Sequence, residues 1–315
     1  MGKSNKSTTI DKFAFHYRLK TDIKKNYPMY LLLLPVLAYY LIFCYKPMYG
    51  AIIAFKDYSP AIGVWDSPWV GFSQFQKFFD NPDFARLLKN TLTISISSIL
   101  FGFPAPIILA ILFNEIRYPK FKSVAQTVSY LPHFISLVVV CGLVKTFVGQ
   151  DGIIHQLVTM FSDNKVGLLS RPECFVPIYV LSDIWQAVGW DSIIYLAALS
   201  GIDQELYESA QLDGANKLKQ ILHITLPGIA PTIIIMLILR LGSLFSVGYE
   251  KIILLYNPLI YETSDVITSY TYRVGLEQMD WSYSSAVGLL NSAINFVIVI
   301  AANKISSKCS ETSLW

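Results

Sequence analysis

Charged residues are scarce in this sequence of 315 amino acids. Asp, Glu, Lys and Arg together make up 15% of the chain, whereas 53% of the residues are hydrophobic. An ordinary soluble domain has about 25% charged residues, because its surface must interact with water. The composition therefore argues against a soluble domain and favours a membrane protein.

Cysteine clusters, phosphate-binding loops and dense basic runs are also missing. The four cysteines share no short spacing, so they indicate neither a zinc site nor a disulfide framework. No Gly-x-x-x-x-Gly-Lys-Ser/Thr run occurs, so the chain does not bind ATP through such a loop. The net charge of +3, without a basic patch rich in aromatics, gives no support for nucleic-acid binding. No nucleophile–base pair or cluster of metal ligands stands out, so we expect no catalytic residue and no metal.

Long apolar stretches dominate what is present. About 20 apolar residues cross a bilayer as a helix. Six stretches reach that length, namely residues 30–55, 90–114, 124–148, 175–200, 226–247 and 284–303. The first is interrupted at Lys46 and Pro47, where proline can end or kink a helix. The sequence therefore predicts an all-α membrane protein with six transmembrane helices.

The distribution of Lys and Arg orients these predicted spans, because basic residues accumulate on the cytoplasmic side. If the N-terminus is inside, the inside segments contain 14 Lys or Arg residues and the outside segments contain 8. Both termini are therefore expected in the cytoplasm. The expected parts are a basic tail over residues 1–29, a transmembrane domain over 30–303 and a tail over 304–315. The first tail is not a cleavable signal, because the apolar run begins only at Tyr30 and lacks a small-residue exit.

The predicted outside segments are rich in aromatic residues. The run from Trp69 to Phe79 predicts a short amphipathic helix lying at the membrane interface. Residues 249–283 include six tyrosines and Trp281, which gives this segment an aromatic, hydrogen-bonding surface.

The loop between the fourth and fifth predicted spans, residues 201–225, has the features of a helix–turn–helix. Asp203 can cap a helix over residues 204–212, because its carboxylate accepts from free N–H groups. Gly214 can adopt the positive φ that ends this helix. A second short helix is expected over residues 216–223, and Pro227 lies where the fifth span begins. Such a projecting helix fits the groove of a partner.

This loop resembles the cytoplasmic EAA loop of ABC importer permeases. The family pattern is Glu-Ala-Ala, two residues, Asp-Gly-Ala, eight residues, Ile, one residue and Leu-Pro. The matching positions are Glu208, Ala210, Asp213, Gly214, Ala215, Ile224, Leu226 and Pro227. Ser209 departs from the second family position, but it is also small.

Further segments are similar to the maltose-type carbohydrate importer permeases. They are residues 69–72, 90–92, 130–132 and 184–190. Residues 193–199 and 262–267 are similar to the subgroup that handles oligosaccharides and polysaccharides in Gram-positive bacteria. The resemblance implies the type I importer permease fold and a location in a bacterial plasma membrane.

The resemblance also implies a transport subunit that depends on partners. Those partners are a second, related permease in a heterodimer, two ATPase subunits that bind ATP and Mg²⁺, and an extracellular solute-binding lipoprotein. This chain itself would need no cofactor and would not be an enzyme. Its loop would couple ATP hydrolysis to the import of an oligosaccharide by alternating access. The coupling residues would be Glu208, Ser209, Ala210, Asp213, Gly214, Ala215, Leu226 and Pro227.

Polar and aromatic residues of the fourth and fifth spans are the candidate substrate contacts. Polar residues inside spans are costly and indicate function, and transport sites lie near the bilayer midplane. The candidates are Trp185, Gln186, Gly189, Trp190, Asp191, Tyr195, Phe245, Ser246 and Tyr249. The alternative is that the aromatic residues anchor spans at the interface and Asp191 pairs with a basic group.

Three other polar residues of the spans are expected to have structural roles. Arg240, within the fifth span, is expected to pair with a carboxylate or a carbonyl of this chain or of the partner permease. Asn291 and Asn295 lie four residues apart on one face of the sixth span. They are expected to hydrogen-bond between helices, although they could also line the pathway.

Two other functions stay open at this point. The same machinery could import another solute, such as a polyol phosphate or a peptide. A membrane sensor or scaffold could use the same fold without transport.

Overall fold

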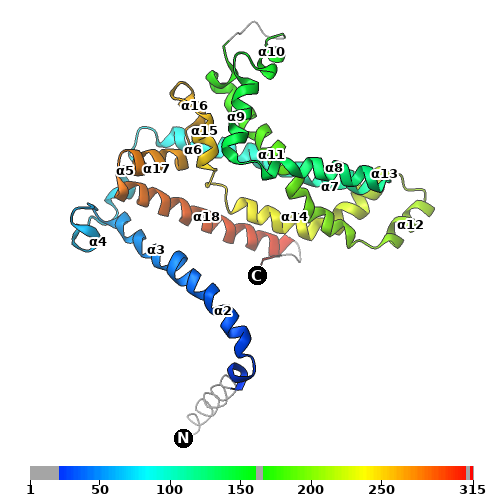
Figure 1. The fold of residues 1–315 in the computed structure, drawn as a ribbon, viewed down its shortest axis with the longest axis horizontal. Coiled ribbons are helices and arrows are strands. Elements are labelled where there is room, and N and C mark those ends of the chain that lie inside the picture. The colour runs from blue at the N-terminus through cyan, green and yellow to red at the C-terminus, as the bar shows by residue number, and fades with distance from the viewer. Residues whose placement is uncertain (1–20, 161–165, 310–312, 315) are drawn as a thin grey trace.

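The computed structural model describes residues 21–160, 166–309, 313 and 314, and these residues are almost entirely helical (Figure 1). Residues 1–20 of the expected N-terminal tail lie outside the described residues, as do residues 310–312 and 315 of the C-terminal tail. Within the described ranges, extended pairing is limited to an isolated antiparallel bridge between Lys56 and Trp69. The prediction of an all-α protein is confirmed.

Five helical runs of the described chain are long and apolar enough to cross a membrane. They are Tyr27–Phe55, Phe84–Glu115, Leu137–Thr159, Lys217–Leu241 and Trp281–Lys308. The fourth predicted span is a single helix of 29 residues, α11 (Pro172–Ser200). At about 1.5 Å per residue it is about 43 Å long, which exceeds the hydrocarbon thickness of a bilayer. Polar side chains, among them Asp183 and Asp191, make it less apolar than the other five.

The first span is continuous, so Pro47 does not end it. Its consecutive segments are α2 (Tyr27–Tyr39), η1 (Tyr40–Tyr45), α3 (Lys46–Met48) and η2 (Tyr49–Phe55). Pro47 lies in the first turn of α3, where proline is tolerated. All side chains from Tyr27 to Tyr49 are exposed, and the helix leaves the rest of the molecule as a single rod (Figure 1).

The predicted third span over residues 124–148 is wrong, because the helix is broken inside it. The segments of this region are α6 (Phe84–Ser97), η3 (Ser98–Gly102), α7 (Pro104–Glu115), α8 (Pro119–Tyr130), η4 (Leu131–Phe134), α9 (Leu137–Val148) and α10 (Ile153–Thr159). Pro132 lacks a backbone N–H, and the extended Ser136 caps α9 by accepting from the N–H of Val139. The span therefore starts at Leu137, and Val124 belongs to the separate helix α8.

The predicted fifth span over residues 226–247 is too long at its C-terminal end. Helix α12 (Gln204–Leu212) is followed by α13 (Lys217–Gln220), η6 (Ile221–Thr225) and α14 (Leu226–Leu241). Residues 242–248 are not helical. Turns pair several of their N–H groups, and α18 (Trp281–Cys309) pairs the backbone of Phe245, where Asn295 Oδ1 accepts from Phe245 N at 3.0 Å and Asn291 Nδ2 donates to Phe245 O at 2.9 Å. The two asparagines therefore hydrogen-bond to another segment of the chain, as expected. Their partner is the irregular segment 242–248 and not a helix.

Short helices gather at the end of the molecule opposite α12 (Figure 1). They include α4 (Gly63–Asp66), α5 (Ser73–Phe79), α15 (Tyr249–Leu255), η7 (Pro258–Ile260), α16 (Tyr261–Ser264), α17 (Ile267–Tyr272) and η8 (Arg273–Glu277), and η5 (Leu168–Ser170) precedes α11. The predicted helix over residues 69–79 starts only at Ser73. The reason is that Trp69 pairs with Lys56 and Gly71 has a positive φ of 60°.

The hydrophobic core surrounds α11, which packs against α7, α8, α14 and α16. Towards α12, Tyr195 and Leu199 of α11 pack with Ile107 of α7 and Ile229 of α14. Towards the opposite end, Phe175 of α11 belongs to a cluster that includes residues of α6, α9, α15 and η7. A third cluster joins α5, α6, α17 and α18. The wall formed by α11 is therefore fixed along its whole length.

A buried ion pair holds the segment between α16 and α17 in place. The carboxylate of Asp265 is fully buried and accepts from Arg273 at 2.7 and 3.1 Å and from Ser269 Oγ at 2.9 Å. Arg86 Nη2 lies 3.7 Å from the same carboxylate, and Asn90 Nδ2 donates to the Asp265 carbonyl at 2.9 Å. Burial lowers the pKa of the Arg273 guanidinium, but the hydrogen bond and negative charge of Asp265 outweigh this and raise it. The Arg273 guanidinium therefore stays charged.

We predict that Asp265→Asn lowers stability strongly. Removing one charge of a buried ion pair costs about 3–5 kcal/mol, because the other charge stays buried without compensation. The measurement is the thermal midpoint of the detergent-solubilised protein, with Asp66→Asn in the exposed α4 as the matched control. Equal midpoints for the two variants would contradict this account.

Candidate functional site

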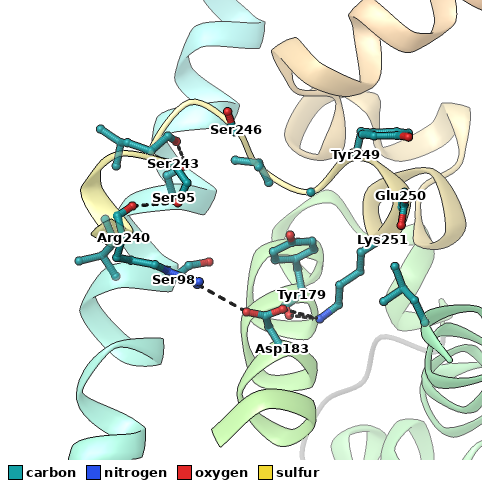
Figure 2. A pocket seen from close by; sticks show the side chains of 15 residues that line it. Ser95, Ser98, Tyr179, Asp183, Arg240, Ser243, Ser246, Tyr249, Glu250 and Lys251 are labelled. Atoms are coloured by element: carbon teal, nitrogen blue, oxygen red, sulfur yellow. Dashed lines mark hydrogen bonds and ion pairs between the residues drawn. The ribbon is translucent and has the colours of Figure 1, made fainter. Parts of the chain in front are cut away.

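A cavity of about 460 Å³ lies where α14 ends and α15 begins (Figure 2). Its walls come from the second span, from α11 and from the irregular segment 242–248. Most of its lining side chains carry hydroxyl groups or charges, namely Ser95, Ser98, Tyr179, Asp183, Arg240, Ser243, Ser246, Tyr249, Glu250 and Lys251. Irregular backbone at membrane depth is tolerated where it is buried in protein or lines a cavity, as here. The arrangement suits a polar ligand rich in hydrogen-bonding groups.

Asp183 bridges two cations of this cavity (Figure 2). Lys251 Nζ lies 3.2 Å from Asp183 Oδ1, and Arg240 Nη2 lies 3.7 Å from Asp183 Oδ2. Lys251 is buried, donates to the carbonyl of Tyr179 at 3.3 Å and lies over the Tyr179 ring. The expectation that Arg240 pairs with a carboxylate is confirmed, and the carboxylate belongs to this chain.

A second, smaller cavity of about 170 Å³ adjoins the first. Asp191 and Tyr195 of α11 and Met236 of α14 are among its lining residues. Asp183 and Arg240 line both cavities. The ion pair therefore lies at the junction between two polar spaces along α11.

Four of the predicted substrate residues reach these cavities, and Phe245 lies behind one of them. Ser246 and Tyr249 line the larger cavity, and Asp191 and Tyr195 line the smaller one. Phe245 is buried, and its backbone is held by the two asparagines of α18.

Trp185 is placed elsewhere, in an apolar cavity of about 370 Å³ between α9, α10 and α11. Neighbours there include Phe147 and Leu181, so this surface suits an apolar neighbour better than a sugar.

The remaining three predicted residues face the break between α8 and α9. Gln186 Nε2 donates to the carbonyl of Ile135 at 3.4 Å, and Trp190 stacks on His133 with ring centroids 4.6 Å apart. A Cβ on Gly189 would collide with the carbonyl oxygen of Ser129. These contacts hold α11 against α8, and none of the three residues lines either polar cavity.

Several residues of the cavity were missed by the sequence analysis. Asp183 could have been found, because an ionisable residue inside a predicted span indicates function. Lys251 could not, because it follows the irregular segment and reaches Asp183 only through the fold. Ser95 is placed against this segment as well, since its hydroxyl donates to the carbonyl of Leu244.

The loop between α11 and α14 has the helix–turn–helix form that the sequence predicts. Asp203 Oδ1 accepts from the N–H of Glu205 at 3.0 Å, and α12 spans the predicted residues 204–212. Gly214 has a φ of 77°, and the N–H of Ala215 bonds back to the carbonyl of Ala210 at 2.9 Å. The loop lies at one end of the molecule (Figure 1). Most of the predicted coupling residues are exposed there, namely Glu208, Ser209, Asp213, Gly214 and Pro227, whereas Ala210, Ala215 and Leu226 are half-buried.

The second helix of the loop differs from the prediction. α13 continues through η6 into α14 without a break, so Pro227 does not mark the start of a separate helix. Tyr207 Oη bonds to Thr225 Oγ1 at 3.0 Å, and Lys217 Nζ lies 2.9 Å from the carboxylate of Glu115. α12 is therefore tied to the base of the fifth span, and α13 is tied to the end of α7.

Residues 102–310 match the family model described as "Binding-protein-dependent transport system inner membrane component". The chain belongs to this family. It is 45% identical to Protein LplB of Bacillus subtilis over 93% of this chain and 92% of that protein. It is 42% identical to the polygalacturonan/rhamnogalacturonan transport system permease protein YteP of the same organism, over 93% of this chain and 91% of that protein.

A solved structure is also similar over nearly the whole chain. It is a chain of the bacterial alginate ABC transporter in complex with an alginate pentasaccharide-bound periplasmic protein. The TM-score is 0.86 at 45% identity, and the match covers 94% of this chain and 100% of that chain. The resemblance to ABC importer permeases is thereby confirmed, and this family member is a multi-pass protein of a bacterial plasma membrane.

We predict that Gly189→Ala destabilises this permease, because its Cβ would meet backbone atoms of Ser129 and force α11 away from α8. Overpacking of this kind costs about 1–3 kcal/mol, and a backbone neighbour cannot move aside as a side chain can. The thermal midpoint of the purified protein is the measurement. Gly142→Ala is the matched control, because a Cβ there meets nothing within 4 Å. A control as unstable as Gly189→Ala would refute the packing argument.

Proposed function

We propose that this permease translocates an oligosaccharide that an extracellular solute-binding protein delivers. The observation that carries the proposal is the polar cavity at the outer end of α14. Its serine and tyrosine hydroxyls, beside a few charges, can donate to and accept from the hydroxyl groups of a sugar. The names of YteP and of the alginate transporter, which refer to polysaccharides, support the same substrate class.

In this proposal the chain crosses the membrane six times, with both termini in the cytoplasm. α11 is the sixth span beside the five apolar ones, and the Lys and Arg distribution gives the orientation. The placement of α12 at the end opposite α4, α5 and α17 supports this topology, because the loop would face the cytoplasm and the short helices the outside (Figure 1).

The proposed partners are a second, related permease, an ATPase dimer and the solute-binding protein. The first span supports the second permease, because its side chains from Tyr27 to Tyr49 are exposed, whereas η2 at its end packs against α18. On the loop, Leu206 is 53% exposed and Leu212 is 90% exposed, so α12 offers an apolar face to a partner. The periplasmic protein in the similar structure supports the third partner. ATP and Mg²⁺ would be bound by the ATPase subunits.

In the proposed mechanism, α12 transmits movement of the ATPase to the spans. Glu208 would make the polar contact, Ser209, Ala210 and Ala215 would allow close approach, and Asp213 with Gly214 would set the turn. Leu226 and Pro227 would carry the movement into α14. The continuous helix from Lys217 to Leu241 supports this, because displacement of one end moves the other. The other end of that helix carries Arg240 and the cavity.

For the pathway itself, we propose that Asp191, Tyr195, Ser246 and Tyr249 contact the sugar. Trp185, Gln186, Gly189, Trp190 and Phe245 would shape the surrounding helices, as their contacts suggest.

The substrate class is tested by reconstituting the complete importer in liposomes and measuring ATP hydrolysis with added solutes. We expect oligosaccharides, delivered by the binding protein, to stimulate hydrolysis and to enter the liposomes. Stimulation only by a polyol phosphate or a peptide would reject the carbohydrate assignment. The absence of any solute uptake would favour a sensor or scaffold instead.

Coupling through the loop predicts that Glu208→Ala and Gly214→Val reduce uptake while the chain still inserts into the membrane. Valine at a φ of 77° is strained, so the turn that orients α12 is disturbed. A loss of about 5- to 150-fold corresponds to a coupling free energy of about 1–3 kcal/mol. Uptake and ATPase co-purification are the measurements, and Glu205→Gln on the same helix is the control. Uptake that persists when the ATPase no longer docks would show that coupling does not run through this loop.

A further inference from the structure

Of the two cations that line the larger cavity, Arg240 has fewer partners than Lys251. Within the described part of the chain its guanidinium donates no hydrogen bond, and its one ionic neighbour, Asp183, lies 3.7 Å away. Its side chain is 44% exposed. A guanidinium has five N–H donors in a planar fork that fits a carboxylate. Arg240 is thus a charged donor whose hydrogen-bonding capacity is unused.

Lys251, the other cation, has the opposite character. Its side chain is only 4% exposed, and Asp183, the carbonyl of Tyr179 and the Tyr179 ring surround its ammonium group. Figure 2 shows Asp183 between the two cations, with Lys251 reaching it from α15 and Arg240 from α14. One carboxylate therefore serves two cations, and it lies closer to Lys251 than to Arg240.

The position of Arg240 places it on the route between the cavities. It lies fourteen residues after Leu226, which corresponds to about 21 Å of helix from the inner end of α14. Only Asp183 and Arg240 are shared by the linings of the two described cavities, so a solute that passes from one to the other meets both. An arginine at the last turn of a helix also interacts favourably with the helix dipole.

We propose that Arg240 is a binding site for a carboxylate of the transported sugar, so that the substrate class is an acidic, uronate-containing oligosaccharide. This inference rests on the proposed function. The sugar carboxylate takes the guanidinium from Asp183, which keeps its bond to Lys251. When the sugar leaves, Asp183 pairs with Arg240 again. This internal competition keeps binding weak enough for release, which transport requires.

Two more carboxylates face these cavities and fit the same substrate. Glu250 lines the larger cavity and Asp191 the smaller one. Within the described residues neither lies within 4 Å of a cationic side chain, so neither occupies Arg240. As acceptors they suit the hydroxyl groups of the same sugar, whereas they disfavour a purely anionic solute without hydroxyls.

The test compares trisaccharides of galacturonate and of mannuronate with their uncharged methyl esters. The complete importer is reconstituted in liposomes as wild type, Arg240→Gln, Arg240→Lys and the control Arg117→Gln, whose arginine is exposed between α7 and α8. We expect wild type and control to import at least one free acid. Uptake of that acid by Arg240→Gln should be about tenfold or more lower than by wild type, because a charge-assisted hydrogen bond is lost. Its uptake of the methyl ester should be unchanged. Arg240→Lys should recover part of the loss, because it restores the charge without the fork.

Three results would overturn the inference. If wild type imports neutral oligosaccharides but none of the acids, the substrate class is wrong while oligosaccharide import stands. If Arg240→Gln reduces the uptake of acid and ester equally, with the complex still assembled, Arg240 is structural. If no oligosaccharide of either kind enters, the proposed function fails together with this inference.

Discussion

Backbone groups inside a bilayer must find hydrogen-bond partners within the protein, and the cavity of this permease depends on how that is achieved. The fifth span stops being helical after Leu241, and turns pair the N–H groups of Gly242, Ser243, Leu244 and Ser246. Asn291 and Asn295 of α18 bond both backbone groups of Phe245, and Asn295 Nδ2 also donates to Ser246 Oγ at 2.8 Å. These amides therefore pair the backbone groups of Phe245 and hold the irregular segment 242–248 against α18.

The irregular segment 242–248 then positions the charged side chains of the cavity. It directs the chain into α15 so that Lys251 reaches Asp183, and it leaves Arg240 at the last turn of α14. Since α11 is packed against α7, α14 and α16, Asp183 is held by a rigid wall. A charge network of this kind can select a ligand because its groups are fixed before the ligand arrives.

The loop and the polar cavity lie at opposite ends of one continuous helix. From Lys217 the helix runs to Leu241, with the loop and α12 attached at its start and the cavity at its end. Tyr207 and Lys217 tie the loop to η6 and α7, so a force on α12 reaches more than one span. Such an arrangement fits alternating access, in which rigid bodies rock around a central site.

The sequence by itself determined the elements whose signals are local. Low charge and long apolar runs indicated a helical membrane protein, and Asp203 and Gly214 predicted the limits of α12, because capping and positive φ depend on neighbouring residues only. The loop pattern also indicated the family. Local signals failed at the ends of the third and fifth spans, where apolar composition continues through Ser136 and past Leu241 although the helix does not. Hydropathy indicates whether a residue prefers water or an apolar environment, and it does not indicate whether the backbone there is helical.

Only the tertiary structure decided which polar residues meet. Asp183, Arg240 and Lys251 come from three elements, and Lys251 lies 68 residues after its carboxylate partner, a distance over which no sequence period operates. Conversely, Gly189 and Trp190 look like pathway residues in the sequence but contact Ser129 and His133 in the fold. The physical reason is that every face of a buried helix has a neighbour, either another helix or a cavity. Packing between segments that are distant in the sequence decides which face has which neighbour, so this is settled only in the assembled core.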